Sequence, residues 1–105
     1  MKPIADPVLT RFRAALDRSY GGRIERVVLY GSRARGDAST DSDYDVAVFI
    51  RDMVDRWQEM DRLADIGTEI LYDEGKLVHG MAYPAGEYRR RTPLMREIRK
   101  DGLDL

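Results

Sequence analysis

The chain has no cysteine among its 105 residues, which excludes disulfide bonds and thiolate metal sites. This composition suits a reducing compartment. The chain also lacks any run that approaches the ~20 apolar residues of a membrane span. Its first segment, Met1–Asp6, contains no apolar signal-peptide core. We therefore expect a cytoplasmic protein that makes no contact with a membrane.

An excess of charge of either sign is also lacking. Eighteen Lys and Arg residues oppose 19 Asp and Glu residues, for a net charge of −1. This balance does not indicate contact with nucleic acid, because it provides no long-range attraction. Hydrophobic residues make up 43% of the chain and charged residues 35%, which is typical of a globular protein. With no repeat, low-complexity tract or linker, residues 1–105 are expected to form a single domain.

Helix and strand signals alternate along the first half of the chain. An N-cap followed by proline, Asp6-Pro7, begins a helical pattern that ends at Gly21-Gly22. The apolar run Ile24–Tyr30 predicts a strand buried on both faces, and Asp43–Ile50 predicts a second strand. A 3.6-residue period then predicts a long amphipathic helix from Val54 to about Tyr72.

The second half continues this order. Gly75 ends the long helix, and Lys76–Tyr83 predicts a third strand. Thr92-Pro93 repeats the cap-and-proline signal and predicts a short helix over Pro93–Lys100. This order is typical of an α/β (α+β) fold, in which helices pack on a small mixed sheet. Whether the first two strands are antiparallel or joined by a tight crossover stays open.

The connection between the first two strands carries the most informative residues. It begins with Gly31-Ser32 and ends at Asp43 and Asp45. Side chains two apart on a strand point to one face, so the two carboxylates can converge. Glycine permits a close backbone approach, and serine supplies a hydroxyl and an amide for a phosphate oxygen. Binding of Mg²⁺ with a nucleoside triphosphate requires such an arrangement.

Three neighbouring residues extend the predicted nucleotide site. Arg33 and Arg35 are candidates for neutralising the triphosphate, although only one of them needs to point inward. Ser42 precedes the carboxylates and either caps the loop or contacts a phosphate. A Gly-Ser turn alone is common, and an Asp-x-Asp pair is often a solvated strand edge. Their combination at this spacing is more specific than either part.

The segments Gly31–Gly36 and Ser42–Asp45 resemble the signature of nucleotidyltransferases of the DNA polymerase β superfamily. More narrowly, they resemble the minimal nucleotidyltransferase domains of prokaryotes. The resemblance implies the DNA polymerase β-like fold and an Mg²⁺-dependent reaction with ATP or another NTP. It implies that Gly31 and Ser32 hold phosphate and that Asp43 and Asp45 hold the metal. It also implies a helical partner, often of the HEPN type, in a two-component toxin–antitoxin module.

The chain departs from the superfamily at one catalytic position. A third carboxylate usually follows the long helix and commonly acts as the base, but residues 76–83 contain no Asp or Glu. His79 lies near the expected place and is interpreted as a base, a metal ligand or a hydrogen-bonded core residue. Glu69, Asp73 and Glu74 are further candidates, and the remaining alternative is that no residue replaces the carboxylate.

These observations lead to two main hypotheses. The first is an Mg²⁺-dependent nucleotidyltransferase that moves AMP from ATP to a hydroxyl of a macromolecular acceptor, and one form of this hypothesis is the antitoxin of a two-component module. Because the chain is short, we expect the acceptor or a second subunit to complete the site, and an oligomer to form. The second is a catalytically degenerate module of the same fold that neutralises a helical partner by contact. A weaker third is an aminoglycoside-type enzyme, for which no cationic-sugar pocket is recognisable.

Three other features have simpler interpretations. Trp57, with Met53 and Met60 at helical spacing, predicts core packing, and any exposed part would form a partner-docking patch. The basic run Arg89–Arg91 predicts a solvated helix face, with contact to RNA or an acidic partner surface as the alternative. Tyr44 is expected to pack on the side of its strand away from the aspartates.

Overall fold

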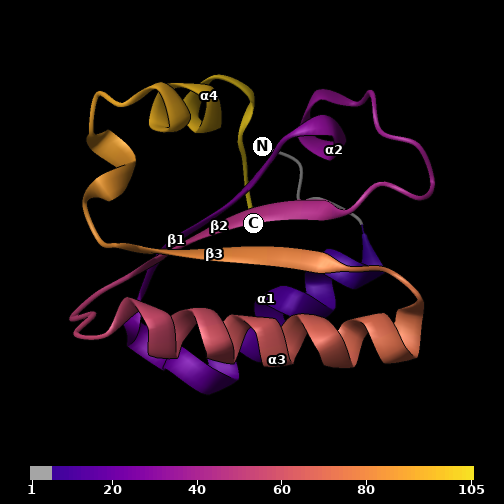
Figure 1. The fold of residues 1–105 in the computed structure, drawn as a ribbon, viewed down its shortest axis with the longest axis horizontal. Helices are drawn as coiled ribbons and strands as arrows, with labels where there is room; N and C mark the ends of the chain where they lie inside the picture. The colour runs from indigo at the N-terminus through magenta and orange to yellow at the C-terminus, as the bar shows by residue number, and fades with distance from the viewer. Residues whose placement is uncertain (1–5) are drawn as a thin grey trace.

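A computed structural model describes residues 6–105 as a mixed sheet with helices on both faces (Figure 1). The segment that was predicted to contain no signal-peptide core includes residues 1–5, which lie outside the described residues. The elements in chain order are α1 (Pro7–Tyr20), a 3₁₀ turn (Gly21–Arg23), β1 (Ile24–Tyr30), α2 (Ser32–Arg35), β2 (Tyr44–Ile50), α3 (Arg56–Glu74), β3 (Val78–Pro84), a second 3₁₀ turn (Glu87–Arg89), α4 (Pro93–Asp101) and β4 (Leu103–Asp104).

The sheet has four strands in the order β3-β2-β1-β4. Strands β1 and β2 are antiparallel, which decides between the two connections that the sequence left open. Strand β3 runs parallel to β2, and β4 runs antiparallel to β1. The predicted mixed sheet is therefore confirmed. Strand β4 was not predicted from the sequence, because a strand of two residues leaves no periodic pattern.

Local side-chain caps set the ends of the helices. The Asp6 carboxylate accepts hydrogen bonds from the amides of Val8 and Leu9 at 2.8 and 3.3 Å. Asp55 caps α3 in the same way, so this helix begins at Arg56 rather than at the predicted Val54. It continues past Tyr72 to Glu74, where Gly75 takes a φ of 69° and ends it.

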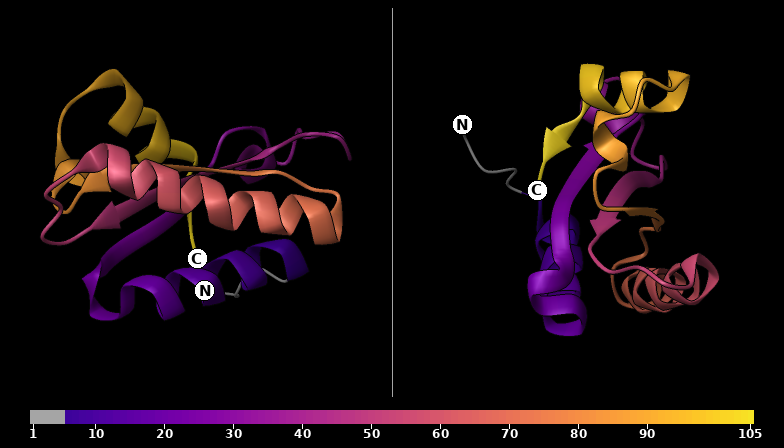
Figure 2. Two further views of the ribbon diagram at one scale, coloured as in Figure 1. Left: turned by 60° about the horizontal axis from the view of Figure 1, so that its bottom comes forward. Right: turned by 90° about the vertical axis from the view of Figure 1, so that its left-hand side faces the viewer.

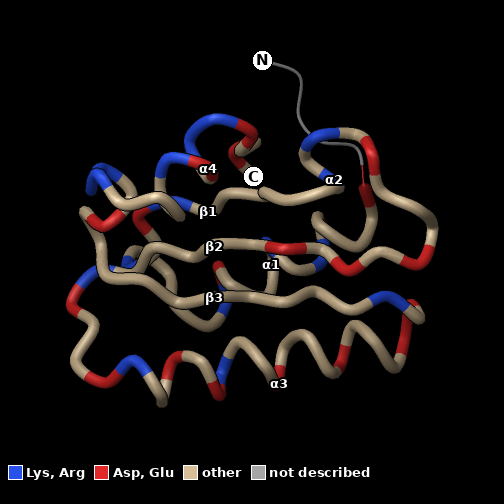
Figure 3. Tube along the Cα trace, turned by 45° about the horizontal axis from the view of Figure 1, so that its top comes forward, with Lys and Arg blue, Asp and Glu red and all other residues tan. Residues whose placement is uncertain are grey.

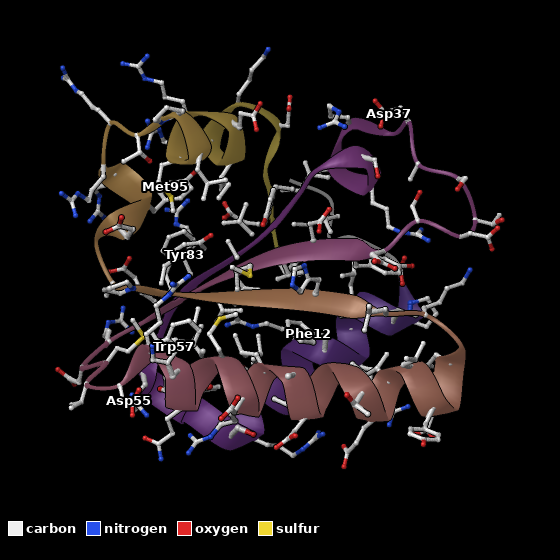
Figure 4. All side chains as sticks on the ribbon, viewed as in Figure 1. Phe12, Asp37, Asp55, Trp57, Tyr83 and Met95 are labelled. Carbon is white, nitrogen blue, oxygen red and sulfur yellow. The ribbon has the colours of Figure 1, made fainter. Side chains whose placement is uncertain are left out.

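Core side chains lie on both faces of the sheet. Helices α1 and α3 cover one face, and α4 lies on the other (Figures 1 and 2). Figure 4 shows Phe12 on the α1 and α3 side and Met95 on the opposite side. Alternate residues of β2 serve both layers, since Val48 packs with Phe12 and Phe49 packs with Met95. This arrangement explains the unbroken apolar run in the sequence.

The core prediction for Trp57 is wrong, because its side chain is 75% exposed. Trp57 lies nine residues before Ile66 on α3, and nine steps of ~100° place the two side chains on opposite sides of a helix. Ile66 packs into the core, so Trp57 points to solvent. Met53 and Met60 do pack against the core and are partly buried. Figure 4 shows Trp57 at the start of α3.

The basic run Arg89–Arg91 is exposed as predicted, but it does not form a face of a regular helix. Arg89 ends the second 3₁₀ turn, and the other two arginines lie in the connection before α4. The Arg99 side chain holds this connection by donating hydrogen bonds to the carbonyls of Tyr88 and Arg90 at 2.5 and 2.8 Å. Across residues 6–105, no helix has the length and apolar character needed to cross a membrane.

Candidate active site

The motif residues meet where β1 ends and β2 begins. Strand pairing aligns Tyr30 of β1 with Asp45 of β2, and Asp45 with His79 of β3. Helix α2 follows β1 directly and lies on the same side of the sheet as α4 (Figure 1). Figure 3 shows acidic residues along the loop after α2 and at the start of β2. The candidate site therefore spans three adjacent strands at one end of the sheet.

Gly31 brings the turn against the Asp45 carboxylate. Its φ is +75°, and a Cβ at this position would lie 2.6 Å from Asp45 Oδ2. Only glycine permits both the backbone conformation and this approach. The amides of Ala34 and Arg35 donate to the Gly31 carbonyl at 3.1 Å each, whereas those at the start of α2 have no acceptor within the helix. The turn is therefore fixed beside the carboxylate and presents backbone donors.

The environment of Asp45 makes its negative charge costly. Burial raises the pKa of the Asp45 carboxyl, and the nearby Asp43 carboxylate raises it further. The charges of His79 and Arg35 act in the opposite direction on the same pKa. Two carboxylates that repel each other in a partly desolvated place are stabilised by a cation between them. The electrostatics of the pair thus favour binding of a positive ion.

His79 is not a core histidine. Its side chain is 61% exposed, and Nδ1 lies 3.9 Å from Asp45 Oδ1. The other candidates for the missing carboxylate lie on α3, which covers the opposite face of the sheet. Asp73 and Glu74 form ion pairs there with Arg11 of α1, at 2.5 and 3.5 Å. Of the four candidates, His79 is the one paired with Asp45.

The structure separates the two candidate arginines. Arg33 donates to the carbonyls of Ser42 and Thr40 at 2.9 and 3.3 Å, and its guanidinium lies 3.9 Å from the centre of the Tyr44 ring. Tyr44 is buried on the side of β2 away from Asp45, as predicted, and its hydroxyl donates to Asp6 at 2.7 Å. Arg33 therefore fastens the loop that leads to β2.

Arg35 lies on the side of the aspartates. It pairs with Asp37 at 3.1 Å and reaches Asp101 of α4 at 4.0 Å. Its hydrogen bond with Asp37 raises the pKa of the Arg35 guanidinium, which stays positive. Its charge also acts on the pKa of Asp45. Of the two arginines, Arg35 is the one placed to meet a negatively charged ligand.

Ser42 closes the loop. Its hydroxyl oxygen accepts a hydrogen bond from the Ser39 amide at 3.0 Å and lies 3.2 Å from the Ser39 hydroxyl. The Lys76 ammonium group, just before β3, also contacts the Thr40 carbonyl. No pattern in the sequence indicates a role for this lysine, because the contact joins segments far apart in the chain.

Tyr30, which the sequence predicts as a structural residue before the turn, is a second neighbour of the site. Burial raises the pKa of its phenol to about 12, and the negative charge of nearby Asp45 contributes to the shift. The phenol therefore stays protonated at neutral pH, and the Tyr30 side chain packs against the core cluster that includes Phe49 and Met95. The position of Tyr30 directly before Gly31 was the sequence signal that could have placed it near the site. Strand pairing sets Tyr30 opposite Asp45.

The donor set can be tested against a divalent metal ion. Within residues 6–105, no three His, Asp or Glu side chains are already gathered around one point. The available donors are the Asp45 carboxylate, the adjacent His79 imidazole and Asp43 at the entry to β2. Mg²⁺ in nucleotide sites is held by one or two carboxylates together with substrate phosphates and water. The residues fit an ion that binds together with a nucleotide.

Comparisons with known proteins identify the family of this chain. The model of the polymerase beta nucleotidyltransferase family matches residues 18–88. A Methanocaldococcus jannaschii protein named as a protein adenylyltransferase is 30% identical over 76 residues, which are 72% of this chain and 70% of that protein.

Solved structures share the fold. The toxin–antitoxin MntA-HpeT, in a mutant form, matches with a TM-score of 0.62 and 17% identity, over 90% of this chain and 69% of that chain. A toxin–antitoxin structure with AMP-PNP matches with a TM-score of 0.58 and 18% identity, over 89% of this chain and 68% of that one. The family match includes the Gly31 turn, both aspartates and β3. The chain therefore belongs to the polymerase beta nucleotidyltransferase family and is a nucleotidyltransferase.

Proposed function

We propose that this nucleotidyltransferase moves AMP from ATP to a hydroxyl of a macromolecular acceptor, with Mg²⁺ held by Asp43 and Asp45. The observation that carries the proposal is the packing of the Gly31 turn against Asp45, where a Cβ would lie 2.6 Å from the carboxylate oxygen. This contact puts backbone donors for phosphate directly beside the candidate metal ligand. A turn that served only to reverse the chain would not need such an approach.

The proposed step exchanges one phosphorus–oxygen bond for another. The acceptor hydroxyl oxygen bonds to the α-phosphorus of ATP, while the bond from that phosphorus to the pyrophosphate oxygen breaks. The hydroxyl proton passes to water, and pyrophosphate leaves. The metal, when bound, offsets the phosphate charge and stabilises the leaving group. Gly31 and Ser32 bind phosphate oxygens, and Arg35 offsets their charge. Arg33 and Ser42 keep the loop and Asp43 in place.

Label transfer tests the proposal. The protein is incubated with Mg²⁺ and ATP labelled at the α-phosphate, together with native cell lysate. Asp45→Asn and Asp43→Asn are each expected to lower labelling of the acceptor on the order of 10³-fold, because each loses several kcal/mol of charge stabilisation. Asp61→Asn, an equal change on the exposed side of α3, should label as the wild type does. Full labelling by both motif variants would exclude the assigned metal ligands.

We further propose that the acceptor is a helical protein partner of the HEPN type, and that the chain acts as the antitoxin of a two-component module. The fold neighbours named as toxin–antitoxin structures support this proposal. The relative named as a protein adenylyltransferase supports a protein acceptor. Mass spectrometry of the labelled band identifies the acceptor. AMP on a side-chain hydroxyl of a helical protein is expected, and a labelled nucleic acid would contradict the partner assignment.

A second function is favoured by one observation. Within residues 6–105, β3 supplies no carboxylate beside Asp45, and the superfamily resemblance implies a base at that place. A degenerate module would neutralise its partner by contact and would need no transfer. Co-expression with the partner separates the two functions. Asp45→Asn should lose protection of the cells if transfer is required, and should retain protection if contact is sufficient.

A further inference from the structure

We infer that His79 is a metal ligand beside Asp45, and that its imidazole makes the site prefer a divalent transition-metal ion such as Mn²⁺ over Mg²⁺. The inference rests on the proposed function, because the ion is the one that would accompany the nucleotide. To the proposed function it adds His79 as a metal ligand and a preference for one class of metal ion. Three features of the structure support this role: the distance between the two side chains, their strand register and the exposure of His79.

The distance between the two side chains suits one shared ion. Nδ1 of His79 lies 3.9 Å from Oδ1 of Asp45. Two donors at ~2.1 Å from an octahedral ion are ~3.0 Å apart when adjacent and ~4.2 Å apart when opposite. The observed separation falls between these limits. It exceeds the length of a normal hydrogen bond, so no direct hydrogen bond between the two side chains has to break for an ion to bind.

The strand register sets this placement. Parallel pairing of β2 with β3 runs without interruption from Tyr44 with Val78 to Ile50 with Pro84, and it aligns Asp45 with His79. Side chains of aligned residues in neighbouring strands lie on the same face of the sheet. The pair therefore belongs to the regular part of the fold and not to the loop after α2.

No structural role explains His79 where it is. At 61% exposure the imidazole buries little surface, and the ion pair that it makes within residues 6–105 is with Asp45. The next residues on this face of β3, Met81 and Tyr83, pack into the layer under α4. His79 thus interrupts an apolar alternation at the point where the strand passes the candidate metal site.

The identity of the donor predicts the metal. Mg²⁺ takes oxygen ligands and keeps its water, whereas imidazole nitrogen is a good ligand for later divalent metals. A nitrogen donor therefore adds little to Mg²⁺ affinity and more to that of Mn²⁺ or Co²⁺. An aspartate at this position would supply oxygen instead, so His79→Asp should shift the preference back toward Mg²⁺.

The chain contains a single histidine, so its imidazole nitrogen signals report on His79 alone once any purification tag is removed. The protein is labelled with ¹⁵N and titrated with Zn²⁺, a diamagnetic probe for imidazole ligation. A large shift of one ring nitrogen, absent in Asp45→Asn, is expected. A shift that persists in Asp45→Asn, or none in the wild type, would overturn the shared site.

Metal preference is measured separately from transfer. Free Mn²⁺ is followed by electron paramagnetic resonance, with and without AMP-PNP, and Mg²⁺ is used to displace it. His79→Ala is expected to weaken Mn²⁺ binding by about tenfold or more and Mg²⁺ binding by less than about twofold. His79→Asp tests the same position with an oxygen donor, and Asp61→Asn is the remote control. Equal Mn²⁺ affinity in wild type and His79→Ala would refute the inference.

The two proposals can fail independently. Label transfer that proceeds with Mg²⁺ and is lost in Asp45→Asn supports the proposed function whatever His79 does. Circular dichroism of each variant shows whether its fold is retained, which is expected because the His79 side chain is exposed.

Discussion

At the scale of single residues, Gly31 and Gly36 flank α2 and form a matched pair. Both have positive φ values, +75° and +83°. A Cβ at Gly31 would lie 2.6 Å from Asp45 Oδ2, whereas a Cβ at Gly36 would meet nothing within 4 Å. The same substitution at these two positions therefore separates backbone strain from displacement of the Asp45 carboxylate.

Gly36→Ala is expected to lower the free energy of unfolding by about 1 kcal/mol, from left-handed strain alone. Gly31→Ala should lower it by about 2–3 kcal/mol, because the methyl group also displaces Asp45. Only Gly31→Ala should abolish label transfer. Urea denaturation and the transfer assay measure both effects. Equal losses of stability and activity in the two variants would contradict the assigned contact.

Asp45 is expected to lower the free energy of unfolding, although it is part of the candidate site. Burial raises the pKa of this carboxyl above its unfolded value. The folded state therefore binds more protons than the unfolded state between the two pKa values, and stability falls as pH rises through this window. Asp45→Asn should have a higher melting temperature than wild type at pH 7. The difference should vanish below about pH 3.9, the pKa of an unperturbed Asp. A lower melting temperature at pH 7 would contradict this reading.

At the scale of elements, α3 protects the open edge of the sheet. Strand β3 pairs with β2 on one side only. On its free side, the Ala82 amide donates to Met60 Sδ at 3.2 Å, and the Ala82 carbonyl accepts from Arg56 Nε at 2.9 Å. A Cβ at Gly67 would lie 2.6 Å from the Val78 carbonyl oxygen, so the helix passes close to the strand. Unpaired strand edges promote aggregation, and these contacts cover this one.

Arg56→Ala should therefore destabilise the protein by about 1–2 kcal/mol, because it leaves the Ala82 carbonyl without its charged donor. It should also increase light scattering on mild heating, since the edge becomes available for pairing. Arg18→Ala removes the same charge from the exposed end of α1 and is the control. If both variants scatter and unfold alike, the edge of β3 does not depend on Arg56.

At the scale of the whole molecule, the net charge is only −1 because two faces of opposite charge nearly cancel. Helix α3 carries six acidic and two basic residues, whereas residues 87–101 carry six basic and three acidic ones. These segments lie on opposite faces of the sheet (Figures 1 and 3). A partner that covers either face is therefore expected to bind more weakly as salt increases.

Trp57 offers a direct measurement of the acidic face, because it is the sole tryptophan and is 75% exposed. Acrylamide quenching of its fluorescence in the dilute folded protein should be nearly as efficient as in the urea-unfolded chain. Protection that grows with protein concentration would show that a second copy covers α3, as the expectation of an oligomer requires. Strong protection at every concentration would contradict the placement of Trp57.

Local patterns in the sequence determined most of the elements. Ile24–Tyr30 has its predicted ends, and Asp6 and Thr92 start their helices as expected. The long helix was displaced by two residues at its start because Asp55 took the capping position. These features depend on hydrogen bonds and steric contacts between residues a few positions apart, which the sequence displays directly.

By itself, the sequence thus determined the positions of the three longer helices and of three strands, and the motif that places glycine, serine and two aspartates together. Only the tertiary structure decided that β1 and β2 are antiparallel, that Arg33 lies over the Tyr44 ring whereas the charge of Arg35 acts on Asp45, and that Trp57 is exposed. It also placed His79 opposite Asp45. The physical reason is that side-chain direction depends on strand register and helix rotation, which are set by contacts between residues distant in the chain.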